Sequence, residues 1–182
     1  MSDWKPTTSI ENLHRRAEII ADIRRYFAEQ KVLEVDTAVL SQCAVSDPFI
    51  DSLEVAFRGY PDAEAESCYL QTSPEYAMKR LLAAGSGSIY QMGKVFRNGE
   101  EGRYHNPEFT MLEWYRLGFD DKDLMDDVER LVCRVLGVGP IRRCTYAEIF
   151  MEKLEVDLQE VSTTELAELM RQHVEVNMDL DD

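Results

Sequence analysis

Two strand-like runs on either side of a charged, glycine-bearing loop constrain the fold more than any other feature. The runs span residues 88–97 and 108–115 and are rich in aromatic and β-branched side chains. The loop between them carries Gly99 and Gly102 among charged and polar residues. Two runs joined in this way predict an antiparallel hairpin with a long tip.

Helices and further strands are predicted on both sides of this hairpin. Thr8 and Glu11 have the spacing of a capping box and open an amphipathic stretch that reaches about Gln30. A second helix is predicted from Pro74 to the Gly85-Ser86-Gly87 break. Three more helices are predicted, at 121–136, after Thr145 and after Ser162, and short strands at 32–36, 53–57 and 68–71.

Length and composition predict one globular domain, since the chain has 182 residues of which 45% are hydrophobic. It contains neither a long apolar run nor a signal-peptide core, so we expect a soluble cytoplasmic protein with no membrane partner. The four cysteines have no metal-binding spacing, so no structural metal site is predicted. The net charge of −15 would repel nucleic-acid backbones, although the same acidity could serve solubility alone.

The loop after the first strand has the composition of a polyphosphate site. Arg97, at the end of the strand, could bind two phosphate oxygens, while Arg103 and His105 on the tip could reach the outer phosphates. Phe109, at the start of the return strand, offers a flat face to a purine ring. The alternative is a solvated hairpin tip above a core aromatic residue.

The hairpin also carries a family resemblance. The strings F-R-N (96–98) and R-Y-H-N-P-E-F-T-M-L-E-W-Y (103–115) resemble motif 2 of the lysyl branch of class II aminoacyl-tRNA synthetases. The resemblance implies an α+β fold in which an antiparallel sheet is flanked by helices. It implies that Arg97 is catalytic through the ATP α-phosphate, that Asn106 lies in the nucleotide site and that Phe109 stacks on adenine. The complete implied ATP site is Arg97, Asn98, Gly99, Glu100, Arg103, His105, Asn106 and Phe109.

An amino-acid pocket is implied by two further segments. The string Q-T-S-P-E-Y (71–76) resembles the family segment in which Ser73, Pro74 and Glu75 line that pocket. Tyr115 matches a residue that holds the amino acid, and Glu113 is either a substrate or metal ligand or an outward-facing polar residue. Without the resemblance, Ser-Pro-Glu is an ordinary helix start with a carboxylate near the helix dipole.

The resemblance is partial. Residues 9–40 resemble motif 1, the dimerisation element, but Ala38 replaces its usual proline, so we expect a weakened homodimer. Residues 88–116 resemble motif 2, although the usual arginine-x-glutamate reads Arg97-Asn98-Gly99 and places Glu100 one position later. The glycine-rich motif 3 does not occur in the 182 residues, and residues 145–182 form an acidic, helical segment. The sequence thus predicts one partial catalytic domain over residues 1–182.

Within this family the chain resembles the branch that lysylates elongation factor P. The implied activity is ATP- and Mg²⁺-dependent activation of lysine or β-lysine and its transfer to a lysine of elongation factor P, and tRNA is not expected as a partner. A truncated tRNA ligase and a non-catalytic nucleotide-binding remnant are the alternatives. Because motif 3 completes the ATP site in the family, we expect the 182 residues alone to activate amino acids poorly, and whether they form an enzyme by themselves stays open.

Overall fold

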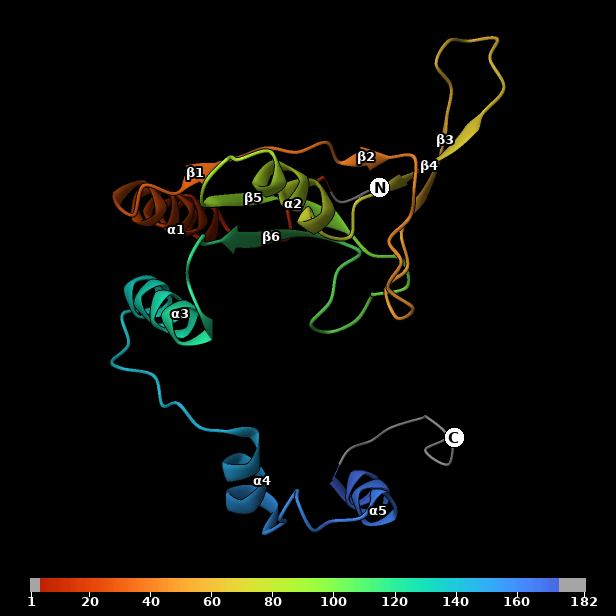
Figure 1. Cartoon of the computed structure of the whole chain (residues 1–182). Coiled ribbons are helices and arrows are strands. Elements are labelled where there is room, and N and C mark those ends of the chain that lie inside the picture. Colours follow the sequence, from red (N-terminus) through yellow and green to blue (C-terminus); the bar gives the residue numbers. More distant parts are fainter. Residues whose placement is uncertain (1–3, 174–182) are drawn as a thin grey trace. The chain divides into compact units, whose positions relative to one another are not determined.

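The computed structural model describes residues 4–173 and shows an α+β protein (Figure 1). Contacts divide the chain into two compact units, one ending at Gly139 and the other beginning at Pro140. The division lies in the Gly-Val-Gly-Pro break after residue 136. The assignment of all 182 residues to one partial domain stays a prediction.

The predicted hairpin is confirmed and forms the centre of the first unit. Strands β5 (Ile89–Phe96) and β6 (Glu108–Tyr115) pair antiparallel in unbroken register from Ile89 opposite Tyr115 to Phe96 opposite Glu108. The short strand β1 (Leu33–Glu34) pairs with β5 in parallel. The expectation of a purely antiparallel sheet is therefore wrong for this edge, because the long connection over residues 35–88 lets β1 and β5 run in the same direction.

A second small sheet lies between β1 and β5 in sequence. Strands β2 (Leu40–Ser41) and β3 (Glu54–Phe57) flank β4 (Glu66–Leu70), and both pairings are antiparallel. Strand β1 is shorter than the predicted strand 32–36, because only Leu33 and Glu34 find partners on β5. The motif 1-like segment continues through Ala38, which is exposed.

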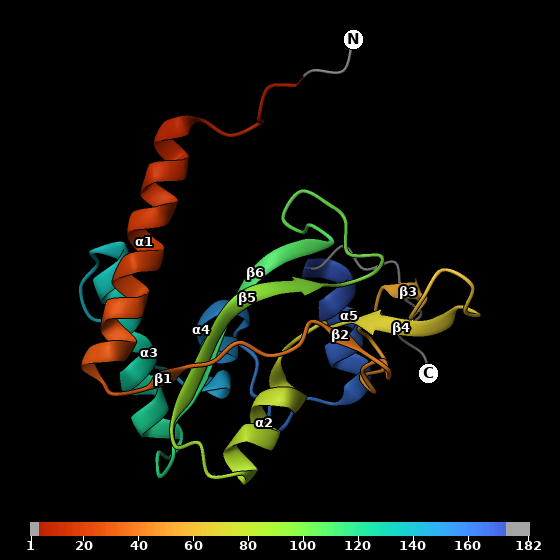
Figure 2. The same ribbon diagram turned by 90° about the horizontal axis from the view of Figure 1, so that it is seen from above.

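Helix α1 (Ile10–Glu29) covers one face of the sheet, and Figure 2 shows α2 (Glu75–Ala83) on the opposite side of β5. The predicted cap at Thr8 is wrong by one residue, since the hydroxyl of Ser9 accepts the hydrogen bond from the Asn12 amide. Phe27 of α1 is fully buried and stacks on Tyr90 of β5 with ring centroids 4.2 Å apart. This stack is the centre of the core.

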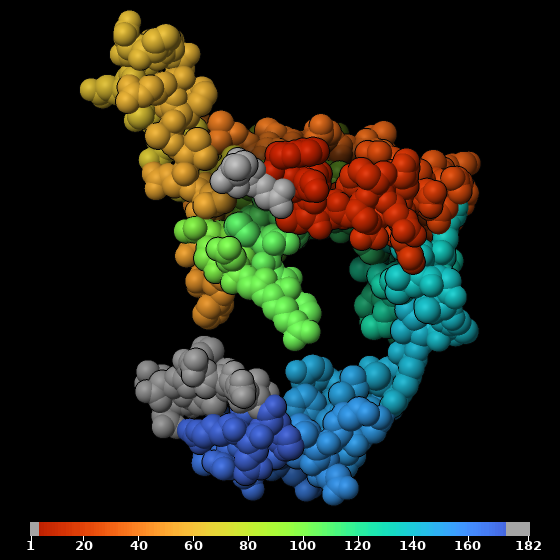
Figure 3. Space-filling view, turned by 180° about the vertical axis from the view of Figure 1, so that it is seen from behind, coloured from red at the N-terminus to blue at the C-terminus, as the bar shows by residue number. Residues whose placement is uncertain are grey.

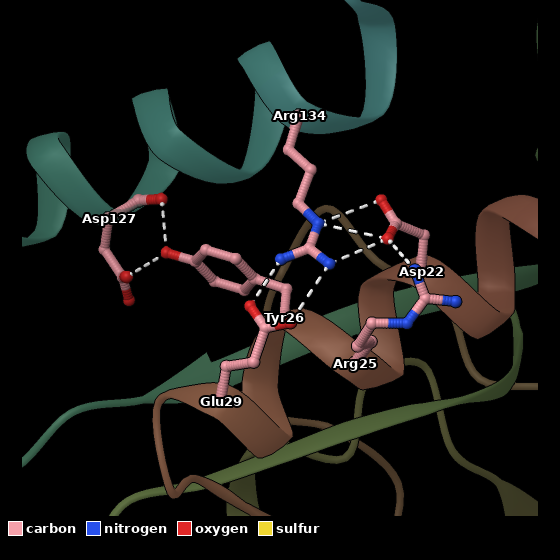
Figure 4. A network of polar contacts seen from close by, with 6 residues as sticks. All are labelled: Asp22, Arg25, Tyr26, Glu29, Asp127 and Arg134. Carbon is pink, nitrogen blue, oxygen red and sulfur yellow. Dashed lines mark hydrogen bonds and ion pairs between the residues drawn. The ribbon is translucent and has the colours of Figure 1, made fainter.

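Helix α3 (Asp121–Leu136) lies beside α1 and has the predicted bounds. Ion pairs join the two helices, as Figure 4 shows: the Arg134 guanidinium lies 2.8 Å from Asp22 and 2.7 Å from Glu29. The hydrogen bond from Arg134 is the main reason that the pKa of the Asp22 carboxyl is lowered. Further along the interface, the Tyr26 hydroxyl points to the Asp127 carboxylate.

The second unit contains helices α4 (Tyr146–Leu154) and α5 (Thr163–His173). Both predicted caps are confirmed. The hydroxyls of Thr145 and Ser162 each accept from the amide three residues on, and their own amides donate to the carboxylates of Glu148 and Glu165. The end of the predicted acidic segment, residues 174–182, lies outside the described residues. Within residues 4–173, no helix has the length and apolar character needed to cross a membrane.

Candidate functional site

Backbone hydrogen bonds hold the base of the loop that joins β5 to β6, formed by residues 96–100 and Pro107. This base is called the root of the loop. The Arg97 amide donates to the Pro107 carbonyl at 2.9 Å, which closes the loop at its base. The Asn98 amide donates to the Asp51 carbonyl at 2.9 Å, and the Phe96 amide donates to the Gln71 carbonyl at 2.9 Å. Two neighbouring segments thus fix the backbone from which the Arg97 side chain extends.

The guanidinium of Arg97 is brought together with two other predicted ATP-site residues. Its central carbon lies 5.4 Å from the centroid of the Phe109 ring, and one terminal nitrogen lies 3.5 Å from Glu100. Its Nε donates to the Thr72 carbonyl at 3.5 Å. Arg97 and Phe109 therefore present a cation beside an aromatic face, an arrangement suited to a phosphate joined to a purine.

Three further predicted ATP-site residues, Arg103, His105 and Asn106, lie in the exposed tip of the loop. Gly102 and His105 exchange backbone hydrogen bonds of 3.1 and 3.3 Å, which form a tight turn around Arg103 and Tyr104. Arg103 lies over the Tyr104 ring, and Asn106 is exposed on the return from the turn. The residues around position 100, light green in Figure 3, project from the surface. In this conformation Arg103, His105 and Asn106 belong to the tip rather than to the anchored root.

Gly99 allows the chain to leave the root sharply. Its φ of +77° lies in the left-handed region, which a glycine adopts without strain. The Glu100 carboxylate follows directly and reaches Arg97, so this acidic side chain, displaced by one position in sequence, still faces the arginine.

A second group of predicted residues gathers around Glu113 in the middle of β6. The Ser73 hydroxyl donates to Glu113 Oε1 at 2.6 Å, and the Tyr115 hydroxyl lies 3.4 Å from Oε2. Ser73 also accepts the amide hydrogen of Glu75, whose carboxylate pairs with Lys79 at 2.5 Å. Pro74, buried between them, precedes the first turn of α2. The structure therefore brings together all five residues predicted for the amino-acid pocket.

Three of these residues, Glu75, Glu113 and Tyr115, border a pocket of about 370 Å³. Its walls are Glu75, Leu112, Glu113, Trp114, Tyr115, Leu124 and Val128. Burial, followed by the nearby charges of Glu113 and Glu75, raises the pKa of the Tyr115 phenol well above its usual range. Two carboxylates beside apolar walls have the chemistry that suits a cation with an aliphatic stem, such as an alkyl ammonium group.

Sequence reasoning missed the contribution of α3 to this pocket. Leu124 and Val128 supply its outer wall, and Asp127 lies between them in sequence with no exposed surface. The sequence did contain an indication of this wall, because Asp127 lies in the same helical stripe as the apolar residues of an amphipathic helix. A charged residue on a buried stripe indicates a specific partner.

Comparison with known proteins identifies the family. The family model described as tRNA synthetases class II (D, K and N) matches residues 2–178. The chain belongs to this family of class II tRNA synthetases.

Its curated relatives carry a narrower description. A protein of Vibrio vulnificus named elongation factor P--(R)-beta-lysine ligase is 52% identical over 165 residues, which cover 91% of this chain and 51% of the relative. Proteins of the same name from Vibrio cholerae and Yersinia enterocolitica are 51% and 48% identical over 92% of this chain. The chain spans about half the length of these curated relatives.

Proposed function

We propose that this chain forms the amino-acid pocket and the α-phosphate side of the ATP site in a ligase that activates lysine or β-lysine and transfers it to a lysine of elongation factor P. The acceptor is suggested by the names of the relatives, which are about half identical to the chain. The site geometry supports the activation step independently of those names.

The observation that carries the proposal is the order of side chains along one face of β6. Alternation along a strand places Phe109, Glu113 and Tyr115 on the same face. Phe109 and Glu113 are four positions apart, which corresponds to about 13 Å along a strand. A purine over Phe109 and an ammonium group at Glu113 are thus separated by a span that suits an aminoacyl adenylate.

Between these two ends, Met111 of β6 lies on the same face, and its partner on β5 is a glycine. Gly93 of β5 lies opposite Met111, and a Cβ added at Gly93 would approach only the Gln91 side chain, at 3.5 Å. The protein itself therefore does not require a glycine here, whereas a ligand lying close to the strand would. The ribose and α-phosphate of a bound nucleotide would lie over this position.

The proposed chemistry follows from the arrangement. The amino-acid carboxylate attacks the α-phosphorus of ATP, forms the acyl-phosphate bond and releases pyrophosphate. Arg97 stabilises the charge that develops on the α-phosphate oxygens. The ε-amine of the acceptor lysine then attacks the acyl carbonyl, so that an amide forms and AMP leaves.

Mg²⁺ is proposed to enter as a complex with the triphosphate. Among residues 4–173, no group of three or more His, Cys, Asp or Glu side chains is placed to hold a metal ion by itself. Mg²⁺ keeps several water ligands and commonly binds through substrate phosphates with one or two carboxylates. Glu100, beside Arg97, is the carboxylate of the root that such a complex would meet.

Two measurements test the proposal. Isothermal titration of the chain should show binding of ATP and of (R)-β-lysine, and Arg97→Ala should weaken ATP binding alone. A chimera in which residues 2–178 replace the matching half of the Vibrio vulnificus relative should exchange pyrophosphate into ATP and lysylate elongation factor P. A chimera that charges tRNA instead, or a chain that binds neither ligand, would contradict the assignment.

A further inference from the structure

Among the described residues of the first unit, the Asp127 carboxylate is the most deeply buried charge, and the proposed chemistry does not use it. The residue has no exposed surface, although it lies on an outer helix. A carboxylate buried in this way is costly unless hydrogen bonds and opposite charges compensate it. The identity of its partners therefore shows what the charge holds in place.

Three elements supply those partners. The Tyr26 hydroxyl of α1 donates to Asp127 Oδ1 and lies 3.1 Å from the Asp127 carbonyl oxygen (Figure 4). From β6, the indole Nε1 of Trp114 donates to Oδ2 at 3.2 Å, and Nε of Arg116, the residue after β6, lies 3.3 Å from the same oxygen. Arg130, one turn along α3, lies 3.3 Å from Oδ1. One side chain thus joins α1, β6 and α3.

These contacts surround the pocket. Trp114 is a pocket wall and lies between Glu113 and Tyr115 in sequence. Leu124 and Val128, the walls supplied by α3, lie three positions before Asp127 and one position after it. Fixing Asp127 therefore fixes both the indole on β6 and the segment of α3 that faces it.

Arg116 strengthens this interpretation. Its side chain is only 8% exposed, and its Nε makes no hydrogen bond within residues 4–173, although it lies within ion-pair distance of Asp127. A buried guanidinium with an incomplete set of hydrogen bonds depends on the neighbouring negative charge. Loss of that charge would weaken the hold on Arg116, the residue next to Tyr115.

We propose that Asp127 is a positioning residue of the amine pocket, which sets the distance between the β6 residues Glu113 and Tyr115 and the α3 wall. This inference rests on the proposed function for the identity of the ligand, a primary amine with an aliphatic stem. Asp127 does not touch the ligand. It acts through Trp114, Leu124 and Val128.

The test compares Asp127→Asn with Asp22→Asn. Both carboxylates join α1 and α3, but Arg25 and Arg134, the residues that pair with Asp22, do not line the pocket. Titration of the intact chain with (R)-β-lysine should show affinity about 10-fold weaker in Asp127→Asn and nearly unchanged in Asp22→Asn. Affinity for ATP should stay the same in both variants. Equal amine affinity in Asp127→Asn and the unsubstituted chain, or equal losses in both variants, would overturn the proposal.

A readout without ligand separates this inference from the proposed function. The chain has two tryptophans, and Trp4 is 83% exposed, so the Trp114 indole N–H can be followed by NMR. Asp127→Asn should shift that signal and speed amide exchange in 113–115 and 124–128, whereas Asp22→Asn should leave both unchanged. If the unsubstituted chain binds no amine, the proposed function fails, and this comparison still decides whether Asp127 positions the pocket walls.

Tyr26→Phe covers the case in which Asp127→Asn does not fold. It removes one donor to the carboxylate and keeps the charges of Asp127 and Arg116. The Trp114 indole signal should shift in the same direction, and amine affinity should fall by a smaller factor, about 3-fold. An unchanged indole signal together with unchanged affinity would overturn the inference.

Discussion

Replacing Glu113 with glutamine tests the amine pocket most directly, because the substitution keeps the shape of the side chain and removes its charge. In the structure the carboxylate accepts from Ser73 at 2.6 Å, and the Tyr115 hydroxyl lies 3.4 Å away. A hydrogen bond to a charged partner contributes about 1.5–3 kcal/mol, and each 1.4 kcal/mol is a factor of ten in affinity. We therefore expect (R)-β-lysine to bind about 10- to 150-fold more weakly.

The assay combines calorimetric titration with a spectroscopic titration of Tyr115. Burial is the main cause of the raised pKa of the Tyr115 phenol, and the Glu113 charge is the next. Glu113→Gln should therefore lower the pKa of Tyr115 without restoring its usual value. The phenolate absorbance, taken as a difference from a Tyr115→Phe variant, measures this change in the absence of ligand.

Glu108→Gln is the matched control. Glu108 lies on the same strand, pairs with Lys94 at 2.8 Å and is half exposed. An exposed ion pair of this kind contributes little, so amine affinity and the Tyr115 titration should both stay unchanged. The reasoning is refuted if Glu113→Gln lowers the Tyr115 pKa but binds (R)-β-lysine as tightly as the unsubstituted chain, since the charge would then not serve the ligand.

Four other predictions concern Arg97 in the candidate ATP site, Phe27 in the core, Arg134 between α1 and α3, and Gly93 on β5. Arg97→Ala should cost about 2–5 kcal/mol of ATP binding in the titration, and lysine at this position should recover only part of it. Phe27→Ala should lower the free energy of unfolding in urea by about 3–5 kcal/mol, because the ring is fully buried. Since Arg134 lowers the pKa of Asp22 from its usual 3.8, its contribution is present at neutral pH and lost as pH falls through the lowered folded pKa; the stability difference between Arg134→Gln and the unsubstituted chain should therefore shrink as the pH falls below 3.8. Gly93→Val should leave urea stability nearly unchanged while weakening ATP binding, and equal ATP affinity would show that no ligand lies over this position.

The elements that the sequence predicts best are those whose signals are local. Strand β6 and helix α3 have the predicted bounds, because a β-rich run and a capped amphipathic stretch mark their own ends. Strand β1 could not be predicted to the residue, because its length depends on which residues meet β5 rather than on its own composition. The cap of α1 at Ser9 rather than Thr8 is a choice between adjacent hydroxyls that sequence alone does not decide.

The candidate site also has features that the sequence predicts and features that it does not. The residue types that would bind phosphate, purine and ammonium could be listed from the hairpin and from the segment 71–76. Their grouping could not, because the hydrogen bond from Ser73 to Glu113 joins positions 40 residues apart. The role proposed for Asp127 could not be predicted from the sequence either, because a charge on an apolar stripe predicts a partner but does not identify it.

The distribution of charge across the site explains how a chain with a net charge of −15 could hold a nucleotide. The carboxylates of Glu75 and Glu113 border the pocket at one end of the β6 face, while the Arg97 guanidinium lies at the other. An amino acid bound with its side-chain ammonium in the acidic pocket would direct its own carboxylate away from it, toward the arginine. An α-phosphate bound at Arg97 would then meet that carboxylate in the middle of the face, over Gly93. Orientation by opposite charges at the two ends would thus supply the proximity that acyl-phosphate formation requires.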